Sequence, residues 1–176
     1  RSREDRNKIY WSMNDTIAKL HNADFKSIGL SDYGKYENYM ARQNARWSKQ
    51  YKDSETTLIP EMDNLIEWLP KNIPPGEEKS IVNGDFRLDN MVFDKNSNEV
   101  IAILDWELST LGHPIADFTY HMMTWRMPLG VQGIGILGAN LDELNIPNEN
   151  EYADAYYQKT NRNEIHNWDF FLAYNM

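Results

Sequence analysis

The chain has 176 residues, of which 41% are hydrophobic, and its six Trp and ten Tyr suit one globular domain with a sizeable core. It contains no Cys, which excludes a disulfide framework and a thiol nucleophile and is compatible with the reducing cytoplasm in which we expect the protein. The net charge of −9 argues against nucleic acid as a partner. No apolar run approaches the roughly 20 residues that span a membrane, so we expect no membrane partner either.

The first half of the chain predicts helices joined by polar loops. Apolar residues recur at helical spacing, and a turn rich in Pro and Gly ends the third helix. Tyr39, Trp47 and Tyr51 fall on one face of the second helix, and we interpret them as core or helix-packing residues rather than as a ligand site. We expect helices over Ser2–Leu20, Tyr36–Ser54 and Glu61–Leu69, and a loop over Ala23–Lys35.

A β-hairpin follows in the sequence. Met91–Asp94 and Val100–Leu104 are apolar, β-prone runs, and the polar segment Lys95–Glu99 between them has good turn chemistry. If the strands pair about the middle of that turn, Asn90 and Asp105 lie opposite each other at the open end, about 5 Å apart. Such a pair can contact one magnesium ion, which takes oxygen ligands at about 2.1 Å.

The polar residues around this hairpin suit magnesium-assisted phosphoryl transfer. Asp85 precedes the first strand in a tight loop begun by Gly84, and Asn90 follows it five residues later. In such transfer one carboxylate orients the attacking hydroxyl, while an amide and a second carboxylate hold metal on the nucleotide phosphates. Asp and Asn are also common at strand ends and turns for local hydrogen-bonding reasons, and this alternative stays open at this point.

The second half predicts further helices over Ile115–Arg126, Tyr152–Thr160 and from Asp169 to the end. The segment Gly133–Gly138 matches G-x-G-x-x-G, but a dinucleotide site needs a strand before it and a helix opening at its last Gly. Neither flank has that pattern, so we interpret the segment as a connection rather than a nucleotide site. The four His show no metal-ligand spacing, and His113 we interpret as structural.

Several motifs together resemble one family. These are NGDFRLDN at residues 83–90 and DWELSTLGHP at residues 105–114, with YMARQ at 39–43 and IEWLP at 66–70. They resemble the aminoglycoside phosphotransferase and choline kinase group, relatives of the protein kinases, and in particular the subgroup associated with acyl-CoA dehydrogenases. The resemblance implies an α+β, mainly helical fold, the C-terminal lobe of a protein-kinase-like fold, with a small β-hairpin that carries the catalytic and metal-binding residues.

The resemblance also implies roles for individual residues. Asp85 is then the catalytic base or the group that orients the acceptor hydroxyl, and Asn90 and Asp105 are the ligands of Mg²⁺ on bound ATP. Arg87 lies where protein kinases have a Lys that faces the transferring phosphate, although a solvated surface Arg is an equal alternative. Glu107 either reaches the metal through water or caps the next helix.

Two further positions qualify the resemblance. Asp117 is similar to the family's buried Asp that supports the catalytic loop through backbone N–H groups, with an ordinary helix N-cap as the alternative. Asn83 stands where the family usually has His, and we expect it to weaken the loop's rigidity without abolishing the chemistry. Nothing before Asp85 has the strands, Gly-rich turn and Lys of an N-terminal nucleotide-binding lobe, so we expect residues 1–176 to be a single domain, the catalytic lobe alone.

The expected activity is therefore that of an ATP-dependent kinase of a small-molecule hydroxyl. The association with acyl-CoA dehydrogenases favours a hydroxy acid or hydroxyacyl-CoA as acceptor, and half of a two-lobed enzyme should turn over little by itself. The main alternative is a non-catalytic kinase-like binding or regulatory module, which Asn83 favours and the intact Asp85, Asn90 and Asp105 oppose. A metal-dependent hydrolase that uses the same carboxylates is a third, weaker hypothesis.

Overall fold

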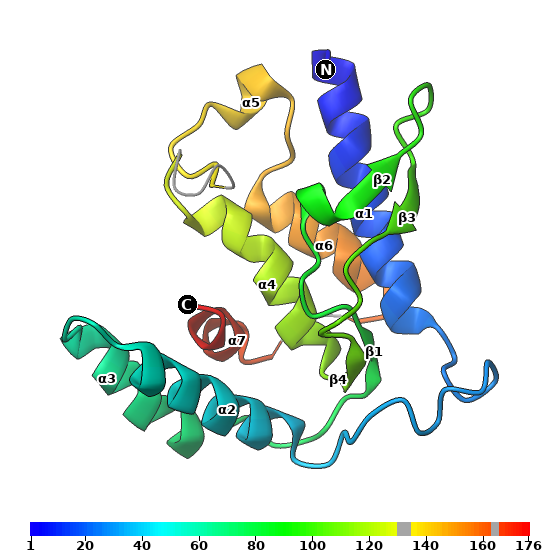
Figure 1. Cartoon of the computed structure of the whole chain (residues 1–176). Helices are drawn as coiled ribbons and strands as arrows, with labels where there is room; N and C mark the ends of the chain where they lie inside the picture. Colours follow the sequence, from blue (N-terminus) through cyan, green and yellow to red (C-terminus); the bar gives the residue numbers. More distant parts are fainter. Residues whose placement is uncertain (130–134, 163–165) are drawn as a thin grey trace.

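The computed structural model describes residues 1–129, 135–162 and 166–176 (Figure 1). Within these ranges the chain forms a mainly helical α+β fold, as predicted. The elements follow in the order α1 (Arg3–Asn22), α2 (Tyr39–Ser54), α3 (Pro60–Trp68), the 3-10 turn η1 (Leu69–Lys71), β1 (Ser80–Val82), the 3-10 turn η2 (Leu88–Asn90), β2 (Met91–Phe93), β3 (Val100–Ile103), β4 (Thr110–Gly112), α4 (Pro114–Arg126), α5 (Leu141–Leu144), α6 (Glu149–Lys159) and α7 (Trp168–Tyr174).

The six predicted helices are present, and each begins and ends within three residues of its expected bounds. Local capping explains several of these ends. The side chain of Ser2 accepts a hydrogen bond from the backbone N–H of Asp5, and the Asp5 carboxylate bonds back to Ser2, which starts α1. Asn148 and Glu151 form the same reciprocal pair at the start of α6. The short helix α5 was not predicted.

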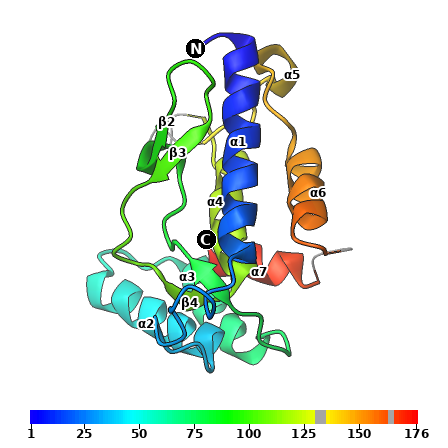
Figure 2. The ribbon, with the colours of Figure 1, turned by 90° about the vertical axis from the view of Figure 1, so that its right-hand side faces the viewer.

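The core lies between α1, α4, α6 and α7 (Figures 1 and 2). Its centre is aromatic: the rings of Phe118 and Tyr156 stack with their centroids 3.7 Å apart, and the ring of Tyr152 stacks on Phe118 at 6.3 Å. Burial of large aromatic side chains contributes much of the stability of such a core. The long helices α1 and α4 thus form a rigid platform for the short strands.

The segment between η1 and α4 contains two small antiparallel sheets. Strand β1 pairs with β4, which brings residues near 80 and 112 together, and β2 pairs with β3 as the predicted hairpin. The hairpin lies along α1 (Figure 2), where the backbone N–H of Val100 donates to Ser12 Oγ at 2.8 Å. Strands β1 and β4 were not predicted.

The hairpin register differs from the predicted one. Met91 pairs with Ile103, and a bulge between Val92 and Phe93 shifts the alignment by one residue. The carbonyl of Asn90 therefore accepts from the N–H of Leu104 at 2.8 Å, so Asn90 lies opposite Leu104 and not opposite Asp105. Asp105 follows at φ +55°, a left-handed conformation that turns the chain at the open end of the hairpin.

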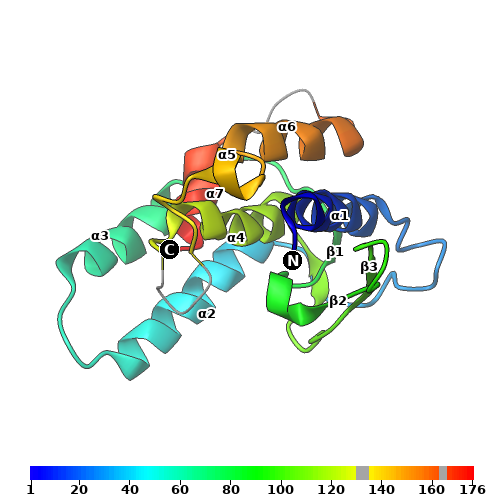
Figure 3. The same ribbon diagram turned by 90° about the horizontal axis from the view of Figure 1, so that it is seen from above.

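Helices α2 and α3 form a pair beside this body. Seen from above, α4 lies between α6 on one side and the α2–α3 pair on the other (Figure 3). The turn η1 ends the pair and packs against both α2 and α7. Gly133 and Ile134 of the G-x-G-x-x-G segment lie outside the described residues, and Leu137 makes only an isolated bridge to Pro128. Among the described residues, no helix combines the length and the apolarity that crossing a bilayer requires.

Candidate active site

The loop between β1 and β2 places Asp85. Gly84 begins this loop at φ +86°, and a Cβ there would lie 2.9 Å from the Cβ of Leu108. The position therefore requires glycine twice, for its backbone conformation and for the close approach of the segment before β4. This agrees with the tight loop that the sequence predicts at Gly84.

The Asp85 carboxylate is held on both oxygens. Tyr120 Oη donates to Oδ1 at 2.5 Å, and Asn90 Nδ2 donates to Oδ2 at 2.8 Å and to the Asp85 carbonyl at 3.0 Å. Burial, and then the bond to Asp85, raises the pKa of the Tyr120 hydroxyl, so this hydroxyl stays protonated and donates. The carboxylate, 21% exposed, is thus fixed in orientation while one side remains open to a ligand.

Asp117 on α4 supports the loop from below. Its Oδ1 accepts from the backbone N–H of Gly84 at 2.8 Å, and its Oδ2 accepts from that of Asn83 at 3.0 Å. His21 on α1 contacts the same Oδ2 at 3.1 Å and bonds Tyr156 Oη through its other ring nitrogen at 2.6 Å. Asp117 therefore joins the loop to α1 and α6. The N-cap of α4 is instead His113, whose Nδ1 accepts from the Ile115 N–H, in keeping with a structural role for His113.

Asn83, in place of the expected His, links the two halves of the site. It is completely buried. Its Oδ1 accepts from the backbone N–H of Asp85 at 3.2 Å, and its Nδ2 donates to the carbonyl of Asp105 at 3.3 Å. One amide side chain thus fixes the backbone at both Asp85 and Asp105, which is a supporting function that an amide can perform because it both donates and accepts.

Two of the predicted metal ligands have open oxygens. With Nδ2 of Asn90 committed to Asp85, the Oδ1 of that amide has no partner in the described part of the chain. Asp105 is exposed to solvent, so its carboxylate is open to a ligand. Within residues 1–129, 135–162 and 166–176, no cluster of three His, Cys, Asp or Glu side chains could hold a metal alone. Such a donor set fits Mg²⁺, which keeps water and takes ligands from nucleotide phosphates.

The two remaining predicted site residues, Arg87 and Glu107, differ in whether they contact Asp85. Arg87 lies beside Asp85 with its side chain 32% exposed: its Nε is 3.3 Å from Asp85 Oδ1, and its Nη2 donates to Asp89 at 2.8 Å. Glu107 is exposed, and the element after it is strand β4, so the proposal that it caps a helix is wrong.

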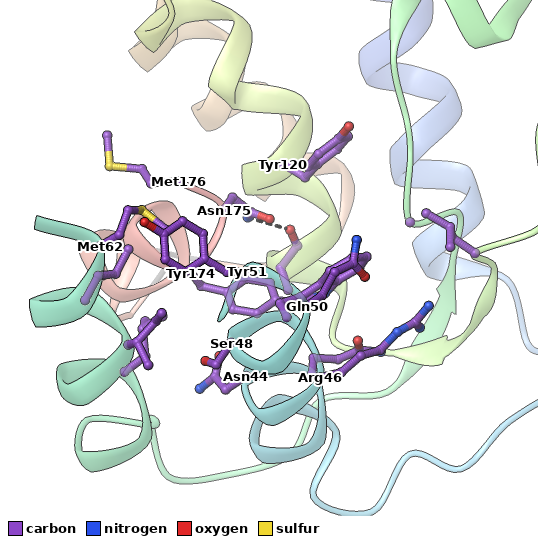
Figure 4. A pocket seen from close by; sticks show the side chains of 18 of the residues that line it. Asn44, Arg46, Ser48, Gln50, Tyr51, Met62, Tyr120, Tyr174, Asn175 and Met176 are labelled. Carbon is purple, nitrogen blue, oxygen red and sulfur yellow. Dashed lines mark hydrogen bonds between the residues drawn. The ribbon is translucent and has the colours of Figure 1, made fainter. Parts of the chain in front are cut away.

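A cavity of about 460 Å³ opens beside Asp85. Gly84, Asp85 and Leu108 border it at one end, and α4, α7 and the α2–α3 pair form the walls (Figure 4). Tyr39, Trp47 and Tyr51 of α2 line it, so the interpretation of these aromatics as packing residues was incomplete. Arg46 is the single Lys or Arg in the lining, all of which lies in the described residues.

Two buried histidines support the same region. His121 lies under the loop, where its ring contacts the carbonyl of Phe86 at 3.2 Å and Tyr152 Oη at 2.8 Å. Burial lowers the pKa of His121 to about 4, and burial likewise lowers the pKa of His113 to about 4. Both rings are therefore neutral near pH 7.

Comparison with known proteins gives the family. A model of the phosphotransferase enzyme family matches residues 1–158. The chain belongs to this family. Acyl-CoA dehydrogenase family member 10 of Mus musculus is 39% identical over 170 residues, which are 96% of this chain and 16% of that protein. The resemblance to aminoglycoside phosphotransferases and to the group associated with acyl-CoA dehydrogenases is thereby confirmed.

Solved structures agree with the family. A Ralstonia eutropha protein, provisionally assigned as an aminoglycoside phosphotransferase, is 49% identical with a TM-score of 0.94 and matches 99% of this chain and 54% of its own. The aminoglycoside-3′-phosphotransferase of type VIII is 16% identical with a TM-score of 0.65, over 99% of this chain and 62% of its own, and shows a shared fold. The chain spans about half of the Ralstonia eutropha protein and 16% of the mouse acyl-CoA dehydrogenase family member.

Sequence reasoning missed Tyr120 and Asn44 at this site. Tyr120 lies one helical turn after Asp117, on the face that α4 presents to the loop, so helical spacing from Asp117 could have identified it. Asn44 and Met40 are the buried residues of α2, and a buried amide without a partner is uncommon on a packing face.

Proposed function

We propose that this protein transfers the γ-phosphate of ATP, with Mg²⁺, to a hydroxyl of a small molecule, a hydroxy acid or a hydroxyacyl-CoA. The observation that carries the proposal is the Asp85 carboxylate, fixed by Tyr120 and Asn90 at the edge of a cavity of about 460 Å³. A carboxylate held in this way can accept a hydrogen bond from a hydroxyl that enters the cavity.

Asp85 then orients the attacking hydroxyl and receives its proton. Each carboxylate oxygen has two lone pairs. Oδ1 meets both the Tyr120 hydroxyl and Arg87 Nε, whereas Oδ2 accepts only from Asn90 among the described residues. A further lone pair can therefore accept the acceptor's O–H. Because the transition state of phosphoryl transfer is loose, orientation of the nucleophile matters more than its prior deprotonation. The fixed rotamer of Asp85 suits this requirement.

Asn90 and Asp105 would hold magnesium, with Glu107 in reach through water. The metal, when bound, neutralises charge on the nucleotide phosphates. Asn83 supports both ends of this arrangement, because it ties the backbone at Asp85 and at Asp105. The Arg87 guanidinium lies against Asp85 and would face the transferring phosphate from there.

The cavity favours an anionic or neutral acceptor over an aminoglycoside, which is polycationic. Of the two acidic residues in the lining, Asp117 is buried and committed to three donors, which leaves only Asp85 to meet a cation. Arg46 instead offers a positive charge, suited to a carboxylate or phosphate. The relative named as an acyl-CoA dehydrogenase supports a functional link between this kinase and such a dehydrogenase.

Residues 1–176 act, on this proposal, as the C-terminal lobe, and a Lys from an N-terminal lobe outside them contacts the ATP phosphates. The isolated chain then turns over little or nothing, because positioning and electrostatics make up most of phosphoryl-transfer catalysis.

A non-catalytic module is the second candidate, and Asn83 is the observation in its favour. Against it, the Asn83 amide makes the two backbone contacts that keep Asp85 and Asp105 in place. A degenerate site would have no need to maintain these contacts.

The test is ATP consumption by the full-length gene product with Mg²⁺ and a panel of hydroxy acids and hydroxyacyl-CoAs. We expect acceptor-dependent consumption, with kcat about a thousandfold lower in Asp85→Ala and unchanged in Asp142→Asn, an exposed residue on α5. Unchanged activity in Asp85→Ala contradicts the assigned role. Magnesium-dependent nucleotide binding that survives loss of both Asn90 and Asp105 contradicts the metal assignment.

A further inference from the structure

The Arg87 guanidinium lies between two carboxylates. Arg87 is the residue before η2, where the backbone is extended at φ −131° and ψ 158°. Its Nε lies 3.3 Å from Oδ1 of Asp85, and its Nη2 donates to Oδ2 of Asp89 at 2.8 Å. The positive charge is therefore held on one side by the carboxylate proposed for the chemistry. On the other side it is held by a second carboxylate, to which the proposed function gives no role.

Asp89 has no other partner that explains its presence. Among the described residues its side chain forms no further hydrogen bond or ion pair, and it is 57% exposed. An ion pair this open to solvent contributes little to the stability of a fold, because water screens the attraction and both side chains lose freedom. The contact between Asp89 and Arg87 is therefore better explained by the orientation that it gives the guanidinium.

One nitrogen of the guanidinium remains open. Nη1 of Arg87 donates no hydrogen bond to any residue that the structure describes, and unlike Nε it is not shielded from solvent. The guanidinium is a planar fork whose N–H directions are fixed relative to one another. Contacts at Nε and at Nη2 therefore determine the direction in which Nη1 donates. Without Asp89 the contact at Nη2 is lost, and the fork is free to rotate.

We propose that Asp89 is a positioning residue for the nucleotide, because it holds the Arg87 guanidinium with Nη1 free to bond a phosphate oxygen of bound ATP. Arg suits this role because its N–H groups donate charge-assisted hydrogen bonds to phosphate in a fixed geometry. Asp89 itself contacts no substrate and acts through Arg87. The inference rests on the proposed function for the identity of the nucleotide, and it adds a residue to the site that holds it.

Nucleotide affinity of the full-length gene product tests this role. The β,γ-methylene analogue of ATP, which is not cleaved, is titrated with Mg²⁺ present and followed by calorimetry. We expect Asp89→Asn to raise the dissociation constant about tenfold, through the loss of one well-oriented hydrogen bond to a charged group. Asp89→Glu keeps the carboxylate and should recover most of this loss. Arg87→Gln should weaken binding at least as much, and adding Asp89→Asn to it should weaken binding no further, because the two residues act as one unit.

The sign of the effect separates a positioning role from a general effect of charge. Removal of a carboxylate beside an anionic ligand should tighten binding by Coulomb's law, whereas loss of the Arg87 orientation weakens it. Asp53→Asn is the matched control, since Asp53 forms a similarly exposed ion pair with Lys49 on α2, outside the cavity lining. Neither Asp53→Asn nor Asp89→Asn should lower the melting temperature. Equal or tighter binding in Asp89→Asn, a further loss in the double variant, or an equal loss in Asp53→Asn overturns the proposal.

Turnover distinguishes failure of this inference from failure of the proposed function. Phosphorylation is measured with the panel of hydroxy acids and hydroxyacyl-CoAs, whereas binding of the uncleaved analogue needs no acceptor. If no acceptor is phosphorylated but Asp89→Asn weakens analogue binding about tenfold, the proposed function fails and the positioning role holds. If phosphorylation occurs but Asp89→Asn and the wild type bind the analogue equally, the positioning role fails and the proposed function holds.

Discussion

The two sides of the cavity differ in how their polar atoms are paired. On the loop side, both oxygens of Asp85 and of Asp117 and both polar atoms of Asn83 have partners within the chain. On the α2 side, Asn44 and Tyr51 have buried polar atoms with no partner among the described residues. The first side is organised before any ligand arrives, as electrostatic catalysis requires. The second leaves these buried atoms without hydrogen bonds, which costs stability.

Substitutions on the loop side should therefore lower both stability and rate, whereas removal of an unpaired polar group on the α2 side should not lower stability. Leaving a buried polar group unpaired costs about 1–3 kcal/mol, and the α2 side incurs this cost. On the loop side the same groups already stabilise the fold.

Removing the charge of Asp117 should have the largest effect. In Asp117→Asn an amide N–H₂ would face the backbone N–H of Asn83 or Gly84, or the ring of His21. We expect the free energy of unfolding to fall by about 3–5 kcal/mol, with kcat reduced as well, measured by urea denaturation and steady-state kinetics. Asp154→Asn, an exposed position on α6, is the control. Native stability in Asp117→Asn would show that the loop is organised by something else.

Acid should weaken the loop side through His121. Its pKa is near 6.5 when unfolded and about 4 when folded, so between these values the unfolded chain binds a proton that the folded chain does not. His121 therefore stabilises the fold fully above pH 6.5, and roughly 3 kcal/mol is lost as pH falls toward 4. Urea denaturation of the wild type and of His121→Gln across this range measures the difference. Identical pH slopes in the two proteins would contradict the neutral, buried ring.

Tyr120→Phe should have a smaller and purely kinetic effect. It removes the hydrogen bond to Asp85 Oδ1 while Asn90 still holds Oδ2. We expect kcat to fall about tenfold, with the KM of the acceptor unchanged, because the carboxylate is less well oriented rather than lost. The opposite split, a higher KM with an unchanged kcat, would place Tyr120 with the α2 side as a binding residue.

The sequence was most informative about the loop side because that side is local. Asp85, Asn90 and Asp105 fall within one short segment, so their spacing and the hairpin could be recognised without the fold. The register was missed by one residue, because pairing about Ser97, the middle of the turn, places Asn90 opposite Leu104 and not opposite Asp105. The bulge between Val92 and Phe93 also leaves no mark in the apolar pattern. Strands β1 and β4 were missed because each has three residues and pairs with a partner distant in sequence.

The sequence could not show that the α2 side borders a cavity. Helical periodicity indicates which residues share a face of a helix, but not what packs against that face. Tyr39, Trp47 and Tyr51 were correctly placed on one face, yet only the fold shows that this face borders a cavity. Asn44 is buried beside them without a partner, and an unpaired buried group is recognisable only when its surroundings are known.

Phosphoryl transfer from ATP to an acceptor hydroxyl is measured most directly by following the phosphoryl group itself. The full-length gene product is incubated with Mg²⁺, a hydroxyacyl thioester and ATP labelled with ¹⁸O in the γ-phosphate, and the acceptor is analysed by mass spectrometry. We expect the labelled phosphoryl group on the acceptor hydroxyl, and we expect Asp85→Asn to form this product about a thousandfold more slowly. Label found only in free phosphate, or product formed at the wild-type rate by Asp85→Asn, would contradict this expectation.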